Sequence, residues 1–413
     1  MTFKTALSGL NAASADLAVT GNNIANASTN GFKESRAEFA DVYATTIQGI
    51  SSLTPGSGVR VSQIAQQFNQ GNIDFTNNNL DLAVNGEGFY ALSDNGALAY
   101  TRAGAFGVDA SGYIVNHAGQ RLQGFPAVTN AGVTAFNTGT LSDLQLATTV
   151  APPNATTTVQ ANVNLDARAV PPANPFTPSD PTSFDGSTSL TLYDSLGNPE
   201  TGTYYYVKTT TPNQWDSYLY INGTNVTYAG NASVPLVFGT NGVLVSAGGN
   251  TNGKFVYDNF AVSGANPLSL TMDYSSSTQY GNSFAVNSLN QDGYTTGRLT
   301  GIEISDDGVI SSRFTNGRST PLGQVALAKF PNPQGLSKLG DTNWGESFES
   351  GNAILGAPRS SNFGGVQSGA LEASTVDISQ QLVNLIVAQR NYQANAQVIT
   401  TENEITQTII NIR

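Results

Sequence analysis

Apolar residues recur with a helical period close to the start of the chain. Within residues 3–24 the large apolar positions are three, four or seven residues apart. They are Phe3, Leu7, Leu10, Leu17 and Ile24. These spacings predict a helix with one apolar stripe, and the Asn- and Gly-rich run at 21–31 predicts its end.

A second and longer stripe lies at the other end of the chain, over residues 372–410. This segment contains no Gly and no Pro, so we expect a helix of about 60 Å at 1.5 Å per residue. Ser374 or Thr375 is a candidate cap for its first turn. The large apolar residues of the stripe include Ile378, Leu382, Leu385, Ile386, Tyr392 and Ile399. Their heptad-like spacing favours coiled-coil packing.

Two apolar helices at the two ends of a chain can pack against each other and then against copies of themselves. The alternative is that both helices cover one globular core. The length of the second helix favours the first interpretation, because a helix of that length would extend beyond a domain of ordinary size.

The residues between the helices show the pattern of strands and turns. Short apolar runs alternate with Asn-Gly, Asp-Gly and Ser-Gly pairs, which is typical of hairpins. The Pro-rich stretch 151–181 predicts a connection into another domain. The expected fold class is therefore mainly β with paired terminal α-helices and nested, discontinuous domains. The expected domains are a helical core (1–25 and 370–413), a linker (26–70), a first β domain (71–144 and 286–369) and an inserted outer β domain (145–285).

Composition excludes several classes of function. The 413 residues include no Cys and one His, so disulfides, thiolate metal sites and Cys nucleophiles are absent. Charged residues make up 11%, against about 25% in an average protein. The net charge of -12 repels phosphate backbones, so we expect no nucleic-acid partner.

No targeting or membrane segment is predicted. Polar residues interrupt every turn of the N-terminal stripe, unlike the continuous apolar stretch of a secretory signal. No stretch approaches about 20 apolar residues, so we expect no membrane association.

Three features could indicate a catalytic or binding site, but each is better explained as an ordinary turn or strand. His117 has no accompanying nucleophile motif and is expected in a surface turn. Asp306–Asp307–Gly308 lacks the remaining ligands of a calcium loop and is expected to form a type I′ hairpin turn. The run Tyr204–Tyr205–Tyr206 is expected to be a strand with aromatic residues on both faces rather than a sugar platform. We therefore expect no catalytic, metal or cofactor site and no enzyme.

Both ends of the chain and parts of its middle carry motifs that resemble a known family. The run LSGLNAASADLAVTGNNIANASTNGFK (7–33) resembles the N-terminal signature of the bacterial flagellar rod and hook family. The run 369–405 resembles the closing helix of the same family, and GEGFY, YTRAGAFGVDASGYIVNHAGQRLQGF and YDSLGN match its middle. The signature residues are Asn22, Asn23, Asn26, Gly31, Phe32, Gln389, Arg390 and Asn395. Thr375 departs from the family pattern, which more often has Asn there.

The resemblance implies a structural subunit of the flagellum. Rod members are shorter, so the insertion at roughly 145–285 favours a hook member, whose copies form a curved, flexible tube that acts as a universal joint. It further implies contacts with the distal rod, the hook cap, the hook–filament junction protein and the export apparatus. Export without a cleaved signal peptide and an extracellular location follow from the same resemblance.

In this family both terminal helices line the inside of the tube. The residues expected to pack there are Phe3, Leu7, Leu10, Leu17, Ile24, Ile378, Leu382, Leu385, Ile386, Tyr392 and Ile399. Two alternatives stay open: a distal rod subunit, which shares the same ends, and a secreted β-rich adhesin, which would not explain the terminal helices.

Overall fold

The computed structural model describes residues 2–42, 56–130, 133–146 and 150–411. Two compact units divide the chain. Unit 1 comprises Met1–Thr148, Gly301–Arg313 and Ser319–Arg413, and unit 2 comprises Thr149–Thr300 and Phe314–Arg318. Unit 2 is thus an insertion into unit 1. The finer division into core, linker and β domains stays a prediction.

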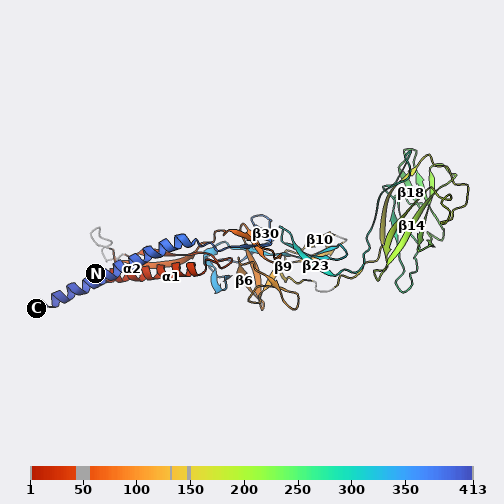
Figure 1. The fold of residues 1–413 in the computed structure, drawn as a ribbon. Coiled ribbons are helices and arrows are strands. Elements are labelled where there is room, and N and C mark those ends of the chain that lie inside the picture. The colour runs from red at the N-terminus through yellow and green to blue at the C-terminus, as the bar shows by residue number, and fades with distance from the viewer. Residues whose placement is uncertain (1, 43–55, 131–132, 147–149, 412–413) are drawn as a thin grey trace. The chain divides into compact units, whose positions relative to one another are not determined.

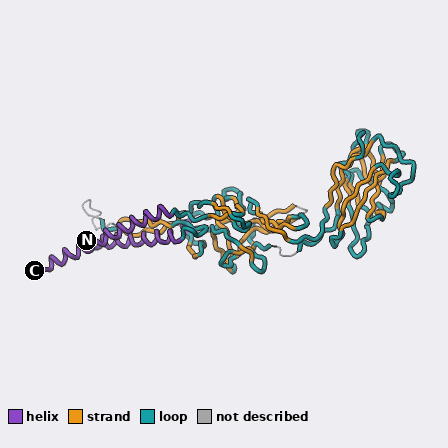
Figure 2. Tube along the Cα trace, viewed as in Figure 1, coloured by secondary structure: helices purple, strands orange, loops and turns teal. Residues whose placement is uncertain are grey.

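Two helices at the chain ends pack side by side in unit 1 (Figure 1). They are α1 (Thr2–Ala25) and α2 (Ile378–Asn411). Asn23 near the end of α1 meets Gln381 near the start of α2, whereas Gly9 lies against Asn395. The pair is therefore antiparallel. Because α2 has 34 residues and α1 has 24, the last turns of α2 extend beyond the start of α1, as Figure 2 also shows.

The rest of unit 1 is β structure. Its strands are β1 (Ser35–Asp41), β2 (Val59–Gln66), β3 (Ile73–Phe75), β4 (Leu82–Asn85), β5 (Phe89–Asp94), β6 (Ala97–Thr101), β7 (Gly107–Val108), β8 (Ile114–Val115), β9 (Arg121–Asn130), β10 (Val133–Phe136), β11 (Ser142–Asp143), β23 (Leu299–Ile304), β24 (Val309–Phe314), β25 (Ser319–Val325), β26 (Leu327–Lys329), β27 (Ser337–Gly340), β28 (Asn343–Gly345), β29 (Ile354–Gly356), β30 (Gly365–Ser368) and β31 (Ala370–Glu372). A short 3-10 helix, η1 (Pro333–Gly335), precedes β27.

One large sheet carries the core of unit 1. Its strands run in the order β23-β24-β25-β9-β5-β6-β28-β27. Strands from the N-terminal half of the chain (β9, β5 and β6) therefore lie between strands from the C-terminal half. Leu92, Leu122 and Leu327 are fully buried in one cluster. A second cluster is aromatic, with the rings of Phe89 and Trp344 in edge-to-face contact. The two halves are therefore parts of one folded body.

Unit 2 consists of two packed sheets. Its strands are β12 (Thr158–Asp166), β13 (Gly186–Tyr193), β14 (Pro199–Lys208), β15 (Gln214–Ile221), β16 (Thr224–Val226), β17 (Val234–Phe238), β18 (Leu244–Ala247), β19 (Lys254–Val256), β20 (Thr271–Asp273), β21 (Thr278–Tyr280) and β22 (Ala285–Gln291). One sheet has the order β13-β14-β15-β17-β18 with β16 beside β15, and the other is β19-β20-β12-β21 with β22 beside β12. Alternating residues of β14 and β15 point into the shared core.

The tyrosine run lies on β14 in unit 2. Tyr204 and Tyr206 are buried in the core, and Tyr205 lies on the opposite face of the sheet. Tyr205 packs there against Phe184 and Tyr220. The expected strand with aromatic residues on both faces is confirmed.

Three local predictions were wrong. The C-terminal helix begins at Ile378 rather than near residue 372, and Glu372 lies in strand β31, which pairs with β3. Helix α2 is capped by Asp377, whose Oδ1 accepts hydrogen bonds from the N–H groups of Ser379 and Gln380 at 2.8 and 3.2 Å. The turn at Asp306–Asp307–Gly308 has a positive φ only at Gly308, so it is not type I′.

The segment expected as a linker contains regular structure. Strands β1 and β2 form an antiparallel pair with a bulge at Glu38/Phe39. This pair lies along α1. Alternation in short polar strands is weak, which is why the sequence pattern did not indicate them.

Candidate assembly surface

Small side chains form the contact between the two helices. The buried residues of α1 include Ala6, Ala12 and Ala13, and α2 buries Ala388. A Cβ atom on Gly9 would lie 2.5 Å from Oδ1 of Asn395, so the close contact of the helices at this position requires glycine. Small residues allow the two helix backbones to come close. The large apolar side chains of both helices therefore lie outside this contact.

Large apolar side chains of both helices are exposed. Among the predicted packing residues these are Phe3, Leu7, Ile378, Leu382, Ile386 and Tyr392. Leu10, Leu17, Ile24, Leu385 and Ile399 are partly buried. Val383, Val387, Val398, Ile405, Ile409 and Ile410 add to the exposed set on α2. We call all these exposed residues of α1 and α2 the apolar helix face.

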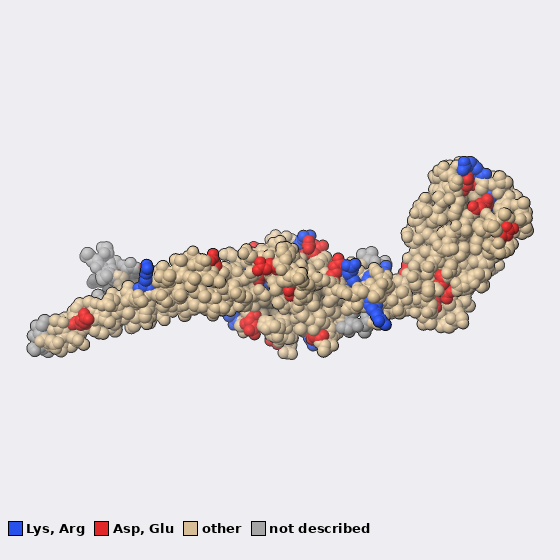
Figure 3. Space-filling view, viewed as in Figure 1, with Lys and Arg blue, Asp and Glu red and all other residues tan. Residues whose placement is uncertain are grey.

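Few charges interrupt the apolar helix face. Both helices together contain only Lys4, Asp16, Arg390, Glu402 and Glu404. Figure 3 shows the same sparse charge along this part of unit 1. An exposed apolar surface of this extent marks a site of association.

The turn after α1 is held by its asparagines. The side chain of Asn23 is buried, donates to the carbonyl of Ser35 at 2.8 Å and accepts from the N–H of Ser35 at 3.0 Å. Asn26 donates to the carbonyl of Asn22 at 2.9 Å and accepts from the hydroxyl of Thr29. These bonds turn the chain from the helix into β1, so the Asn-rich run has a structural role.

The remaining signature residues divide into buried and exposed positions. Gly31 has a φ of 70°, and a Cβ there would lie 2.5 Å from the backbone nitrogen of Ala103. Phe32 is partly buried, while Gln389 and Arg390 are exposed. Asn395 lies against α1 at Gly9 and donates to the carbonyl of Asn391 at 2.8 Å. Of these four residues, only Gly31 is required by the backbone conformation at its position.

A buried charge cluster joins the base of the helices to the sheet. Nζ of Lys33 lies 2.6 Å from Oε1 of Glu372, and Nη1 of Arg102 lies 3.3 Å from Oε2. All three side chains are buried. Burial lowers the pKa of Lys33, and the neighbouring Glu372 carboxylate opposes that shift. The carboxylate also accepts the N–H of Gly71 at 2.8 Å, so both oxygens are engaged.

The cluster connects three distant parts of the chain. Lys33 follows the turn after α1, Arg102 follows β6, and Glu372 ends β31, five residues before the Asp377 cap. The N–H of Gly31 also donates to the carbonyl of Glu372 at 2.8 Å. The cluster therefore fixes both helices to the same part of the sheet. Sequence reasoning missed it, although all three residues lie in the quoted signature runs.

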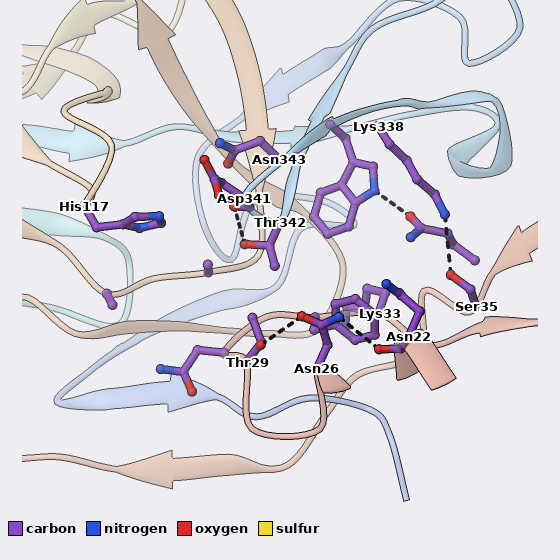
Figure 4. A pocket seen from close by; sticks show the side chains of 17 residues that line it. Asn22, Asn26, Thr29, Lys33, Ser35, His117, Lys338, Asp341, Thr342 and Asn343 are labelled. Carbon is purple, nitrogen blue, oxygen red and sulfur yellow. Dashed lines mark hydrogen bonds between the residues drawn. The ribbon is translucent and has the colours of Figure 1, made fainter. Parts of the chain in front are cut away.

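A cleft of about 540 Å³ opens beside the turn after α1 (Figure 4). One wall is the Asn22–Thr29 turn and the other is the β27–β28 hairpin, with His117 at one side and Lys338 at the other. His117 is exposed, as predicted. Nε1 of Trp344 donates to Oε1 of Gln66 at 2.5 Å in the cleft wall.

The described residues contain no group of three or more His, Cys, Asp or Glu side chains placed to hold a metal ion. Within the same residues, no helix is long and apolar enough to cross a membrane. What the geometry does supply is an apolar face for association.

Comparison with known families agrees with that arrangement. Residues 3–33 match the flagella basal body rod protein model, and 83–166 match the flagellar hook protein FlgE/F/G D1 domain. Residues 164–294 match the flagellar basal body protein FlaE D2 domain, and 367–412 match the flagellar basal body rod FlgEFG protein C-terminal region. These matches define the class as the rod and hook proteins of the bacterial flagellum.

Comparison with full-length relatives identifies one family within this class. The chain is 39% identical to the flagellar hook protein FlgE of Salmonella typhimurium, with all of both chains covered. It is 38% identical to FlgE of Escherichia coli over all of both chains, and 34% identical to FlgE of Borreliella burgdorferi over 98% of each. The chain belongs to the flagellar hook protein family. It is a structural subunit of the flagellum and not an enzyme, and neither the distal rod nor the adhesin alternative is favoured.

A solved structure has a similar fold. The flagellar hook protein FlgE2 of Helicobacter pylori superposes with a TM-score of 0.55 at 17% identity. The match covers 73% of this chain and all of the other. The mainly β architecture with helices at both ends is thereby confirmed as the fold class.

Proposed function

We propose that copies of this chain assemble into the curved, flexible tube of the flagellar hook. The tube carries torque from the rod to the filament and acts as a universal joint. The observation that carries the proposal is the apolar helix face, which is exposed in the single subunit. Membership of the hook family supports the same function.

Burial of the apolar helix face drives assembly in this account. Each large apolar side chain that leaves water contributes roughly 1.5–3 kcal/mol. Leu382, Ile386 and Tyr392 are partly exposed in the subunit, so part of that contribution is still available. Contacts between unlike surfaces of identical copies extend without closing, which gives a helical tube.

The sparse charge of the chain suits a tube that bends. Few ion pairs hold neighbouring copies in a fixed register, and contacts through Asn, Ser, Thr and water exchange partners at low cost. We assign the outer, adjustable contacts to the inserted β domain, residues 145–285. The inner contacts are assigned to the helix pair.

The assembled hook meets other flagellar proteins at its two ends and during export. We infer contacts with the distal rod, the hook cap, the hook–filament junction protein and the export apparatus. We also infer export without a cleaved signal peptide to the extracellular hook. The intact mass of subunits from isolated hooks tests it.

Substitution on the apolar helix face tests the assembly itself. Ile386→Asp places a charge on an exposed position, so the subunit should keep its fold and lose tube formation. The matched control is Asn95→Asp, which adds the same charge at an exposed polar position in the turn between β5 and β6, away from both helices. Tubes are counted by electron microscopy. Normal tubes from the Ile386 variant would reject the assignment of this face.

A further inference from the structure

One aromatic side chain of unit 1 is fully exposed to solvent among the residues that the structure describes. Phe348 follows β28 and is fully exposed, the most exposed large apolar side chain among the described residues. Its position is fixed by the serines on either side. The N–H groups of Ser347 and Glu349 donate to the hydroxyls of Ser350 and Ser347 at 2.9 and 3.1 Å.

Further hydrogen bonds hold the turn that carries Phe348. Ser350 is buried and its hydroxyl donates to the carbonyl of Ser347 at 2.9 Å. The hydroxyl of Ser347 donates to the carbonyl of Gly335 at 2.5 Å. A rigid turn has already lost its conformational freedom, so an aromatic residue at its tip binds a partner at low entropic cost.

The surroundings of Phe348 are acidic. Glu346 and Glu349 flank it in the sequence, and both are exposed. Among the described residues neither carboxylate lies within ion-pair distance of a cation. The turn thus offers one aromatic ring between two negative charges. We call residues 346–349 the Phe348 turn.

The cleft beside α1 has the complementary chemistry. Lys338 lies on its wall, and the only polar partner of its Nζ among the described residues is the hydroxyl of Ser35 at 3.4 Å. Phe32, which is partly buried, supplies aromatic surface, and the buried Trp344 also lines the cleft. Asp341 on the hairpin turn is the one carboxylate among the lining residues.

An unsatisfied polar atom lies in the same cleft wall. Asn343 is buried and its Nδ2 donates to Oε1 of Gln120 at 2.9 Å. Its Oδ1 is buried and has no hydrogen-bond partner in the part of the chain that the structure describes. A buried acceptor without a donor costs free energy, and a ligand that brings an N–H group would satisfy it.

We propose that the Phe348 turn of one subunit docks into the cleft of a neighbouring copy of the same chain. The ring packs against Phe32, the flanking carboxylates face Lys338, and an N–H of the turn reaches Asn343. The surface that enters differs from the surface that receives it, so the contact extends from copy to copy without closing. The proposal rests on the proposed function only in requiring that copies assemble.

Disulfide trapping tests this contact, because the chain has no cysteine of its own. Phe348→Cys subunits and His117→Cys subunits are polymerised as a mixture and oxidised. His117 is chosen because it lines the cleft and is exposed. Cross-linked dimers should form in the mixture and not in polymers of either variant alone.

The matched control replaces a different exposed phenylalanine. Phe75 on β3 is exposed and lies outside the cleft lining, so Phe75→Cys mixed with His117→Cys should give no dimers. Equal cross-linking from both pairs, or none from the Phe348 pair in well-formed tubes, would overturn the proposal. Cross-linking of Phe348→Cys to a different flagellar protein in isolated hooks would likewise overturn it.

Loss of the ring should weaken assembly without abolishing the fold. Phe348→Ala is expected to raise the lowest concentration at which tubes form by about tenfold or more, as for a buried aromatic anchor. An unchanged threshold would contradict docking. Because wild-type tubes are measured in parallel, failure of the wild type to assemble would count against the proposed function, whereas normal tubes from Phe348→Ala would count only against this contact.

Discussion

Glu372 is a carboxylate buried between two cations, Lys33 and Arg102. Removal of one partner from such a cluster leaves uncompensated charge in the interior, which costs far more than the loss of an exposed pair. Glu372 lies shortly before the start of α2, so its ion pairs also hold the helices against the sheet. At the scale of single residues, this is where the sparse charge of the chain matters most.

Glu372→Gln should therefore lower the free energy of unfolding of unit 1 by about 3–5 kcal/mol. Trp344 reports on unit 1 by fluorescence in a Trp215→Phe background, since the chain has only these two tryptophans. Asp306→Asn is the matched control, because its pair with Arg359 is exposed and should contribute less than about 1 kcal/mol. Equal losses from both variants would contradict the special role of the cluster.

Asp194 in unit 2 gives a prediction that depends on pH. Burial raises its pKa, but hydrogen bonds from the Asn198 side chain and from the N–H groups of Asn198, Leu196 and Gly197 outweigh this and hold the pKa below its usual value. Its Oδ1 accepts two of those N–H groups at 2.8 Å. An acid with a lowered pKa stabilises the fold above its unfolded value, and that contribution is lost as pH falls through the folded pKa.

We expect Asp194→Asn to destabilise unit 2 by about 1–2 kcal/mol at pH 7, because Asn offers one acceptor where the carboxylate offers two. The difference from wild type should shrink as pH falls through the lowered pKa of the Asp194 carboxyl, because the protonated wild-type side chain has lost the same charge. Urea denaturation followed by Trp215 fluorescence measures both. A difference that stays constant from neutral to acidic pH would show that the charge plays no part.

At the scale of elements, the two terminal helices and their pairing could be predicted from sequence, whereas the residues that form their contact could not. Large residues such as Leu382 and Ile386 define the stripe, and they are exposed, while Ala12 and Ala388 make the internal contact. Periodicity gives most weight to large side chains, so it indicated the surface available for association and missed the internal seam. The presence of two terminal helices and a β middle followed from the pattern directly.

Contacts between distant segments were also beyond the sequence pattern. Lys33 and Glu372 are 339 positions apart, and Arg102 and Glu372 are 270 apart. Nothing local distinguishes these residues from exposed charges. The cleft is similar, because its walls come from the turn after α1 and from a hairpin near residue 341.

The helix pair should be only marginally stable in the isolated subunit. Its internal contact buries mostly alanine, whereas its large apolar residues stay in water. We expect amides of α1 and α2 to exchange rapidly in the monomer and slowly in the tube. Amides of β5 and β9, whose residues Leu92 and Leu122 are fully buried, should exchange slowly in both states. Slow exchange of the helices in the monomer would contradict this.

At the scale of the whole molecule, the chain enters and leaves the inserted unit 2 through two segments that lie next to each other. The N–H of Ala151 donates to the carbonyl of Gly297 at 2.8 Å, so the two crossing segments are joined by backbone hydrogen bonds. A short Gly-Ser linker can therefore replace residues 152–296. Unit 1 has its own core and should fold without the insertion.

We expect this deletion to change the free energy of unfolding of unit 1 by less than about 1 kcal/mol and to alter the curvature of the tubes. The reason is that the inserted domain is assigned the adjustable contacts and the helices the fixed ones. Trp344 fluorescence reports the stability and electron microscopy reports the curvature. Tubes with unaltered curvature would contradict the role given to the insertion.

Electron cryomicroscopy of the purified polymer would show whether the two terminal helices line the tube, because it places every helix in the assembly. We predict a hollow tube in which α1 and α2 form the inner wall and the side chains of Leu382 and Ile386 are buried between neighbouring copies. A polymer with these helices on its outer surface, or with their apolar face still in contact with water, would contradict it.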